Sequence, residues 1–496
     1  MINFDKPRPP ATHTRQAAAP PSAARRPTLV FDERTLQPSN SGQAGLTGKG
    51  RAVNDGATWF VLASIALAPI PMASVWPVFW LVWSLIMCLA LAAYMIAMQI
   101  VEPQRPLACT QAWRFILAGL ALPGFALVQF LLSLTGMTTG FAGFTLPAGS
   151  VAPDATLMAA MRMFGVFALF VLVFEISTRA ERVSLIAWGL FFIVLLHAFW
   201  ALLALIFLDD FVLWGEKLAY QGVATGTFVN RNSFAAFLGM GLVAGVCMIL
   251  QRAHRPQTRT SRGQTWLSEK NIELALLWLM VFIIALTLVA TQSRMGVLSS
   301  FLAAWVAYLV MALKWQDQAI KAVFRASVIA VVAVVAGALT MGAGLSERAL
   351  FAVADGDNRT ALYLQAIGMI AEAPLLGVGI DGFRAAFELV HQPPVSTAFV
   401  WDLAHSTYLT WWIEAGLIMG SVPMLLLAAA FVSLVRTIRR RRTHYAVPVL
   451  GLAVILQMAL HSLIDFSLEI QANLMMFVVI LAIALGRLRR SDPGRA

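Results

Sequence analysis

Long apolar runs separated by short polar connections make up most of the chain. A helix needs about 20 mostly apolar residues to cross a bilayer, and about twelve runs are long enough. Pro69, Pro71 and Pro77 crowd the junction of the first two, where Pro suits a tight turn, although a re-entrant pair is an alternative. We therefore expect an all-α polytopic membrane protein with these spans: 57–73, 75–98, 113–133, 157–176, 183–208, 232–250, 273–290, 295–313, 324–344, 408–434, 446–463 and 472–486.

Two polar stretches interrupt this pattern at length. Residues 1–56 are rich in Pro, Ala, Ser, Arg and Gly, which is typical of a disordered tail. The longest loop, 345–407, lies before the tenth span and carries apolar residues at helical spacing. Long loops in a compact protein are usually functional or disordered, and this spacing favours a helical, functional loop.

Composition supports the membrane class and excludes others. The chain is 59% hydrophobic and 12% charged, whereas soluble proteins carry about a quarter charged residues. The net charge of +11 is spread between apolar runs and does not form one basic face, so we expect no nucleic-acid partner. The spacing of Cys88, Cys109 and Cys247 supports neither a disulfide framework nor a zinc site. No apolar segment of a cleavable signal peptide occurs in the first thirty residues.

The distribution of Lys and Arg predicts the orientation. With the N-terminus in the cytoplasm, 29 of the 36 basic residues fall on the cytoplasmic side, as the positive-inside rule requires. Both termini are then cytoplasmic, and loop 345–407 is periplasmic. The seven other cations are Arg162, Lys217, Arg231, Arg294, Arg348, Arg359 and Arg384.

Three of these arginines suggest an anion site. Arg231, Arg294 and Arg359 each lie at the outer end of a span or in the outer loop. The planar guanidinium binds phosphate bidentately and keeps its charge. Snorkelling or pairing with a nearby carboxylate is the alternative for each of them.

Two short polar segments place these arginines at helix starts. Residues 226–235 (GTFVNRNSFA) open the sixth span, where Asn230 or Asn232 can cap a helix whose N-terminus favours phosphate. Residues 291–296 (TQSRMG) include the four-residue connection between two spans, 291–294, which brings Arg294 to the same face. Capping alone is the simpler explanation of the first segment, but capping does not require Arg231.

His405, near the end of the long loop, is a candidate general base. An imidazole can be neutral at physiological pH and accept a proton, and neighbouring arginines favour the neutral form. A structural histidine at the membrane interface is the alternative. The aromatic residues Tyr408, Trp411 and Trp412 fit an interfacial belt, although aromatic rings also stack on sugars.

Two further features suggest supporting roles. His461 and Asp465 are four residues apart near the outer end of the eleventh span, which favours a supporting hydrogen bond over catalysis. Arg162 lies inside the fourth span, and an intramembrane charge is a functional hypothesis by default.

Four segments together resemble the O-antigen ligase/Wzy-type polymerase superfamily: GTFVNRNSFAAFL, TQSRMG, NRTALYLQAIGMIAEAPLLGVG and AHSTYLTWWIEAGLIMG. The later HSLIDFSLEIQAN is similar to exopolysaccharide-polymerase members. The resemblance covers roughly residues 155–475, including loop 345–407. It leaves out the N-terminal helices in 57–154 and, at 476–496, the end of the last helix with a basic cytoplasmic tail.

This resemblance implies a glycosyltransferase-C-like enzyme of the inner membrane with a periplasmic site. Such enzymes transfer a glycan from undecaprenyl diphosphate to an acceptor hydroxyl, on lipid A-core or a growing glycan, with no cofactor or metal ion. Membrane lipids and polysaccharide-assembly proteins are further expected partners.

Carried over to this sequence, the resemblance assigns roles to single residues. Arg231 and Arg294 would hold the diphosphate, Arg359 would assist, and His405 would be the base. Glu414 matches a common acidic position of unassigned role. The remaining candidate substrate-binding residues are Asn230, Asn232 and Tyr408. The family often has His-Asn where this chain has His405-Ser406, which fits the polymerase-like branch better than a strict ligase.

Two other classes remain alternatives. A transporter or flippase should show paired repeats with broken helices in matching positions, but here the long loop follows span nine and not span six. A structural assembly subunit without activity is the second alternative. The sugar, the acceptor and the oligomeric state are not encoded in any recognisable motif.

Overall fold

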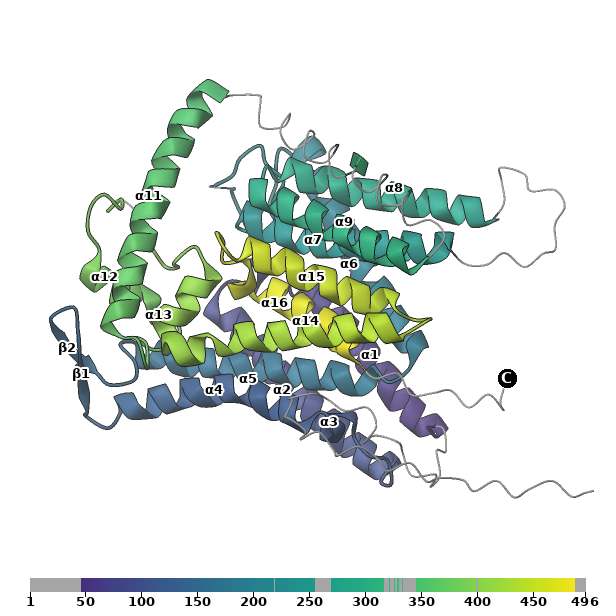
Figure 1. The fold of residues 1–496 in the computed structure, drawn as a ribbon, viewed down its shortest axis with the longest axis horizontal. Coiled ribbons are helices and arrows are strands. Elements are labelled where there is room, and N and C mark those ends of the chain that lie inside the picture. The colour runs from purple at the N-terminus through teal and green to yellow at the C-terminus, as the bar shows by residue number, and fades with distance from the viewer. Residues whose placement is uncertain are drawn as a thin grey trace, which may run out of the picture. The chain divides into compact units, whose positions relative to one another are not determined.

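The computed structural model describes residues 46–217, 219–254, 269–315, scattered positions between 321 and 332, 345–397 and 400–486. Most of the predicted N-terminal tail, most of the ninth span (324–344) and the last ten residues lie outside this part of the chain. Within it the protein is almost wholly helical, as the apolar pattern predicts (Figure 1).

The first half of the bundle follows the predicted spans closely. Its elements are α1 (Gly48–Leu67), η2 (Met72–Ser74), α2 (Pro77–Val101), α3 (Ala108–Gln111), α4 (Trp113–Ser133), α5 (Pro153–Ile176), α6 (Ala180–Phe207), α7 (Arg231–Ala253), α8 (Glu269–Ala290) and α9 (Arg294–Lys314). Helix α1 begins at Gly48, so the predicted tail boundary at residue 56 is wrong. Thr47 caps this helix by accepting from the Gly50 amide at 3.1 Å, and a cap of this kind sets a helix start.

The second half departs more from the predicted spans. Its elements are α11 (Leu345–Glu372), α12 (Phe383–Val390), α13 (Thr407–Gly420), α14 (Val422–Arg440), α15 (Ala446–His461), η4 (Ser467–Glu469) and α16 (Gln471–Leu485). The predicted tenth span is two helices, because Gly416 leaves the helical conformation (φ 72°) and Pro423 starts a new helix.

Eight of the described helices are long and apolar enough to cross a membrane: α2, α4, α5, α6, α7, α8, α9 and α14. The apolar helices α15 and α16 are shorter. The count of twelve spans therefore stays a prediction, since the ninth lies mainly outside the described residues.

Helix α7 is the centre of the bundle. In its apolar window 94% of the residues are buried, against 22% in α2 and 17% in α4. Small residues let neighbours approach closely: a Cβ on Gly241 would lie 2.4 Å from the Val194 side chain of α6. A helix that is apolar all round is expected at such a position, whereas α2 and α4 leave large apolar side chains exposed.

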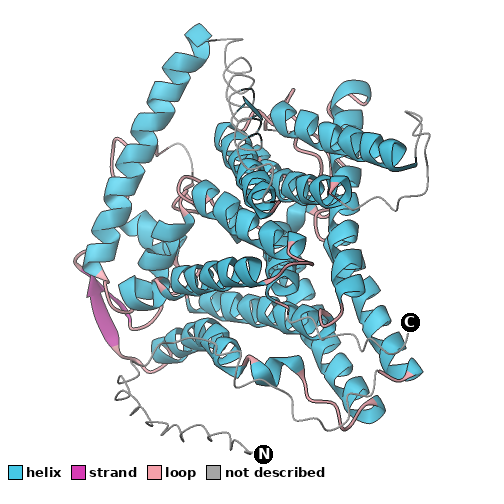
Figure 2. Ribbon diagram, turned by 45° about the vertical axis from the view of Figure 1, so that its right-hand side comes forward, coloured by secondary structure: helices cyan, strands magenta, loops and turns pink. Residues whose placement is uncertain are grey.

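A β-hairpin and the helices α11 and α12 lie at one end of the bundle, which we call the loop end (Figure 1). The hairpin is formed by β1 (Thr138–Phe141) and β2 (Phe144–Pro147), and it is the one element type that the all-α prediction missed. Its two-residue turn, Ala142-Gly143, has positive φ at both positions, as a tight hairpin turn requires. The Ala142 amide donates to the Glu372 carboxylate at 3.2 Å, which joins the hairpin to the end of α11 (Figure 2).

Candidate active site

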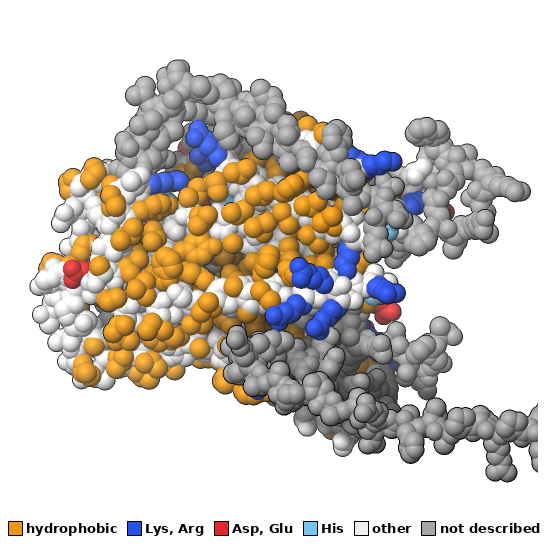
Figure 3. All heavy atoms as spheres, in the orientation of Figure 1, with side chains coloured by type: hydrophobic (Ala, Val, Ile, Leu, Met, Phe, Trp, Pro, Cys, Tyr) orange, Lys and Arg blue, Asp and Glu red, His pale blue; other side chains and the backbone are white. Residues whose placement is uncertain are grey.

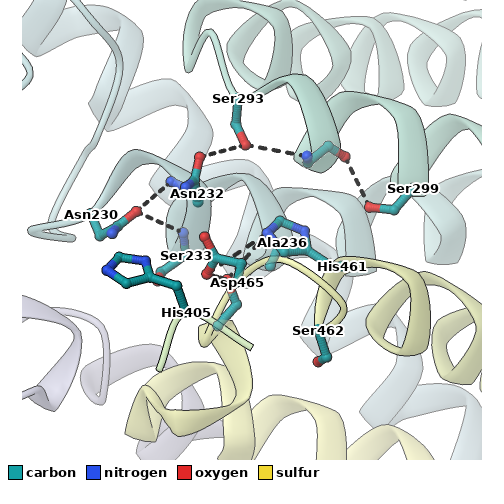
Figure 4. A network of polar contacts seen from close by, with 12 residues as sticks. Asn230, Asn232, Ser233, Ala236, Ser293, Ser299, His405, His461, Ser462 and Asp465 are labelled. Atoms are coloured by element: carbon teal, nitrogen blue, oxygen red, sulfur yellow. Dashed lines mark hydrogen bonds and ion pairs between the residues drawn. The ribbon is translucent and has the colours of Figure 1, made fainter. Parts of the chain in front are cut away.

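Two helix N-termini lie together at the loop end. Asn230 caps α7 by accepting from the amides of Asn232 (2.7 Å) and Ser233 (3.4 Å). Ser293 caps α9 by accepting from the Gly296 amide at 3.2 Å. The Ser293 hydroxyl also donates to Asn232 Oδ1 at 2.8 Å (Figure 4). The two caps are therefore joined directly.

Close packing keeps these two helices in register. A Cβ on Gly296 would lie 2.4 Å from the Cβ of Ala235, so α9 and α7 touch in their first turns. Arg231 and Arg294 are the first residues of the two helices. The positive dipole ends of both helices add to the two guanidinium charges, and the sum favours an anion.

The connection between α6 and α7 holds Arg231 from the other side. The Arg231 guanidinium lies over the Tyr220 ring, 5.3 Å from its centroid. Lys217 Nζ donates to Asp210 and to the Val223 carbonyl, both at 2.6 Å, which fixes the loop before this helix. Arg231 is half-buried and Arg294 is exposed, so one cation is fixed and the other faces solvent.

His405 lies in the turn before α13 with φ 54°. Its ring packs edge-on against Trp401 (centroids 5.7 Å apart) and Phe466 (5.1 Å), and its carbonyl accepts from the Tyr363 hydroxyl at 3.0 Å. The next residues are bonded to the connection after α15: the Thr407 amide donates to the Ser462 carbonyl at 3.1 Å. The imidazole, which is half-buried, is thus held by three separate segments.

Arg359 belongs to the same group. Burial raises the pKa of the Tyr363 phenol, the Arg359 charge lowers it and the Asp465 charge raises it. Arg359 and Asp465 therefore both lie within electrostatic range of the residue that anchors His405. The role of Arg359 in the site stays a prediction.

The start of α7, which carries Arg231, and the segment that packs against His405 are bonded to each other. Asn473 donates to the carbonyls of Ser233, in the first turn of α7, and of Ser467, which follows Phe466. Figure 4 shows His405 and Asp465 beside the start of α7, with Asn230 and Ser233. The structure thus brings together residues that are distant in sequence.

Tyr408 and Glu414 have other partners. The Tyr408 hydroxyl donates to the Ala459 carbonyl of α15 at 2.9 Å. The buried Glu414 carboxylate accepts from the Phe383 amide, the first residue of α12, at 3.2 Å. These contacts favour a structural role over direct contact with substrate for both side chains.

Arg162 is the centre of a second polar cluster that sequence reasoning left without partners. Its Nε donates to Gln471 at 2.9 Å and its Nη2 donates to the Glu469 carbonyl. The charges of Asp381, Glu414 and Glu469 act on this guanidinium. Burial raises the pKa of the Glu469 carboxyl to about 8, although Arg162 and the hydroxyls of Thr407 and Thr410 lower it. One buried arginine thus lies within electrostatic range of three carboxyls.

The predicted pairing of His461 and Asp465 is indirect. His461 Nε2 lies 4.0 Å from Asp465 Oδ1, too far for a hydrogen bond. The Ser467 hydroxyl lies between them, donating to Asp465 at 2.8 Å and lying 3.3 Å from His461 Nε2. Within the described residues, no three His, Cys, Asp or Glu side chains gather as they would around a metal ion.

Comparison with known protein families decides the chemistry class. Residues 279–423 match the model of the family described as O-antigen ligase. This segment is therefore similar to the O-antigen ligase family. The resemblance expected from the sequence motifs is therefore confirmed. No curated protein matches the chain.

The O-antigen ligase segment runs from α8 to the start of α14. It contains Arg294, Arg359 and His405, whereas Arg231 and Asn473 lie outside it. The site is therefore built from this segment together with α7 and α16. The match to this family indicates a glycosyltransferase-like enzyme of surface polysaccharide biosynthesis. Together with the apolar helices, it indicates a multi-pass membrane protein.

Proposed function

We propose that this protein transfers or polymerises a glycan linked to undecaprenyl diphosphate at the periplasmic face of the inner membrane. The observation that carries the proposal is the pair of joined N-termini, α7 and α9, each beginning with an arginine and bonded through Asn473 to the segment under His405.

Arg231 and Arg294 bind the diphosphate in this proposal. A lipid diphosphate leaves readily once its developing negative charge is stabilised, and preorganised cations and helix amides supply that stabilisation without a metal ion. Asn230 and Asn232 contribute by holding the two helix starts in place, and Arg359 adds a third positive charge. Tyr408 and Glu414 then support the fold around the substrate.

His405 accepts the proton of the acceptor hydroxyl. The acceptor oxygen forms a bond to the anomeric carbon, the bond from that carbon to the phosphate oxygen breaks, and undecaprenyl diphosphate leaves with the electron pair. The acceptor is the end of a growing glycan or lipid A-core, and both offer such a hydroxyl.

The charge distribution supports a periplasmic site. Basic residues occupy the last turns of α7, α9 and α14, at the end away from the hairpin: Arg252, Lys314, Arg439 and Arg440. In Figure 3 hydrophobic side chains cover the middle of the visible face, and most of the visible Lys and Arg side chains lie on the side away from α11 and α12. By the positive-inside rule the basic end is cytoplasmic, so both termini are cytoplasmic and the loop end is periplasmic.

Substitution of the central residues tests this function. We expect His405→Ala and Arg294→Ala each to abolish surface polysaccharide in cells, while the protein inserts at normal levels. Purified protein should join a lipid-linked oligosaccharide, extracted from cells lacking the protein, to the acceptor, and both variants should lower this turnover at least 100-fold.

Arg384 supplies the matched control. It is an exposed arginine in α12 at the same end, paired with Glu388 and Asp402 at 3.2 Å. Arg384→Ala should keep normal polysaccharide. Normal polysaccharide in both central variants would contradict the proposal, and tracer uptake into vesicles without glycan transfer would favour a transporter.

A further inference from the structure

The segment from His461 to Asn473 turns its polar side chains into the bundle. His461, Asp465, Ser467, Gln471 and Asn473 are all buried. Polar groups buried among apolar helices are costly unless they are hydrogen-bonded, so each one needs an explanation. The proposed chemistry uses none of these side chains.

Asn473 makes the contacts that relate to the site. Its side chain is fully buried, and its Nδ2 donates to the carbonyls of Ser233 at 2.9 Å and Ser467 at 3.0 Å. Ser233 follows Arg231 by two residues in the first turn of α7. Ser467 follows Phe466, whose ring supports His405. One amide group thus joins the two halves of the site.

The oxygen of this amide indicates the role of the Asn473 side chain. Asn473 Oδ1 is buried and has no hydrogen-bond partner among the described residues, which destabilises the fold because the oxygen loses its water without gaining a partner. An apolar side chain would avoid that cost. The amide is therefore useful for its two donated bonds and not for general packing.

Ser467, one of the two residues that Asn473 joins, is itself held by hydrogen bonds. The Ser467 hydroxyl donates to Asp465 Oδ1 and contacts His461 Nε2, and Thr407, two residues after His405, contacts the Asp465 carbonyl at 3.3 Å. Movement at Asn473 would therefore be passed to both segments that carry the imidazole.

We infer that Asn473 is a positioning residue that sets the separation between the diphosphate-binding arginines and His405. This inference rests on the proposed function. In-line transfer needs the acceptor oxygen, the anomeric carbon and the base in fixed relation, and a displacement of about 1 Å can lower the rate about 100-fold. Binding of the diphosphate alone depends on one half of the site and needs no such relation.

The test separates binding from turnover. Asn473→Leu removes both donors and the unpaired oxygen while it keeps the branching of the side chain. We expect its turnover of the extracted lipid-linked oligosaccharide to fall about 10- to 100-fold. Its Kd for undecaprenyl diphosphate in detergent should stay within about two-fold of wild type. Asn473→Asp keeps the shape, loses at least one donated bond and should show the same split in weaker form.

Gln457 of α15 is a matched control, because its side chain is bonded to the same helix α7. This fully buried amide donates to the Ala236 carbonyl at 3.0 Å and contacts Ser300 at 3.3 Å, one turn deeper, and its Oε1 is also unpartnered. Gln457→Met should change the unfolding temperature comparably but keep turnover within about two-fold, since it touches neither Ser233 nor Ser467.

The outcomes distinguish a failure of the inference about Asn473 from a failure of the proposed function. If wild-type protein transfers glycan and Asn473→Leu and Asn473→Asp do so at the same rate, the inference is overturned while the function stands. Equal loss of turnover in Gln457→Met would also overturn it, because the effect would then be general destabilisation. If wild-type protein transfers no glycan, the proposed function itself fails.

Discussion

At the residue scale, the site uses few ionisable groups, each with a separate partner. His405 is supported by two aromatic rings and a carbonyl contact from Tyr363. Arg231 lies over the Tyr220 ring. Arg162 instead lies within electrostatic range of the carboxyls of Asp381, Glu414 and Glu469.

The Glu469 carboxyl predicts how stability depends on pH. Its pKa is raised from 4.5 to about 8, chiefly by burial, so the folded protein holds its proton where the unfolded chain has lost it. Stability from this group is fully present below about pH 4.5 and is lost as the pH rises through 8. The loss is at most about 1.4 kcal/mol per pH unit in this window.

Thermal unfolding in detergent between pH 5 and pH 9 checks this prediction. We expect the unfolding temperature of wild type to fall with rising pH and that of Glu469→Gln to fall less, because the amide cannot ionise. Parallel curves for the two proteins would show that Glu469 does not keep its proton.

At the element scale, glycines set how closely the functional helices approach. Gly296 lets the first turns of α7 and α9 touch. Gly377, with φ 72°, lies where a Cβ would be 2.3 Å from the Glu414 carbonyl oxygen, which places the turn after α11 against α13. The turn is bonded to α13: the Val378 amide donates to the Ile413 carbonyl at 2.9 Å.

Gly296→Ala tests the contact between the two arginine-bearing helices. The added methyl would lie 2.4 Å from Ala235 Cβ, so the helices must separate, and we expect a loss of about 1–3 kcal/mol in stability. Turnover should fall as well, because the separation moves Arg231 relative to Arg294.

Gly124→Ala is the control for that substitution. Gly124 lies inside α4, and a Cβ there meets nothing within 4 Å. Its replacement should stabilise the helix by up to about 1 kcal/mol and leave turnover unchanged. Unfolding in detergent and the transfer assay measure both effects. If the two alanine variants behaved alike, the close approach of α7 and α9 would not matter.

At the scale of the whole molecule, the proposed orientation places the loop end in the periplasm. Two exposed positions test it: Thr139 in β1 and Thr443 between α14 and α15. In a background without the native cysteines, a membrane-impermeant maleimide should label Thr139→Cys once the outer membrane is permeabilised. Thr443→Cys should react only after the inner membrane is broken. The reverse pattern would refute a periplasmic site.

Cys109 shows why the native cysteines are poor reporters for that experiment. Burial and, to a smaller extent, the Glu175 carboxylate together raise the pKa of its thiol to about 12. The thiolate is the reactive form, so Cys109 should label slowly from either side even though it lies in a connection. Cys247 is buried within α7.

The apolar pattern alone determined the membrane class, most helix positions and the helix starts that carry Arg231 and Arg294. Spans, caps and glycine breaks are local properties, since each depends on residues within a turn or two. The sequence analysis missed the hairpin, although Ala142-Gly143 is a local signal for its turn. It also missed the break in the tenth span at Gly416, although Pro423 is a local signal for a new helix start.

Only the tertiary structure decided which polar residues act together. Ser293 reaches Asn232 across 61 positions and Asn473 reaches Ser233 across 240, and no periodicity in a sequence encodes such a pairing. It depends on how α7, α9 and α16 pack. The same packing places Glu414 and Tyr408 against structural partners, and it places Arg162 near three carboxyls. A side chain's partner depends on burial and distance and not on residue type alone.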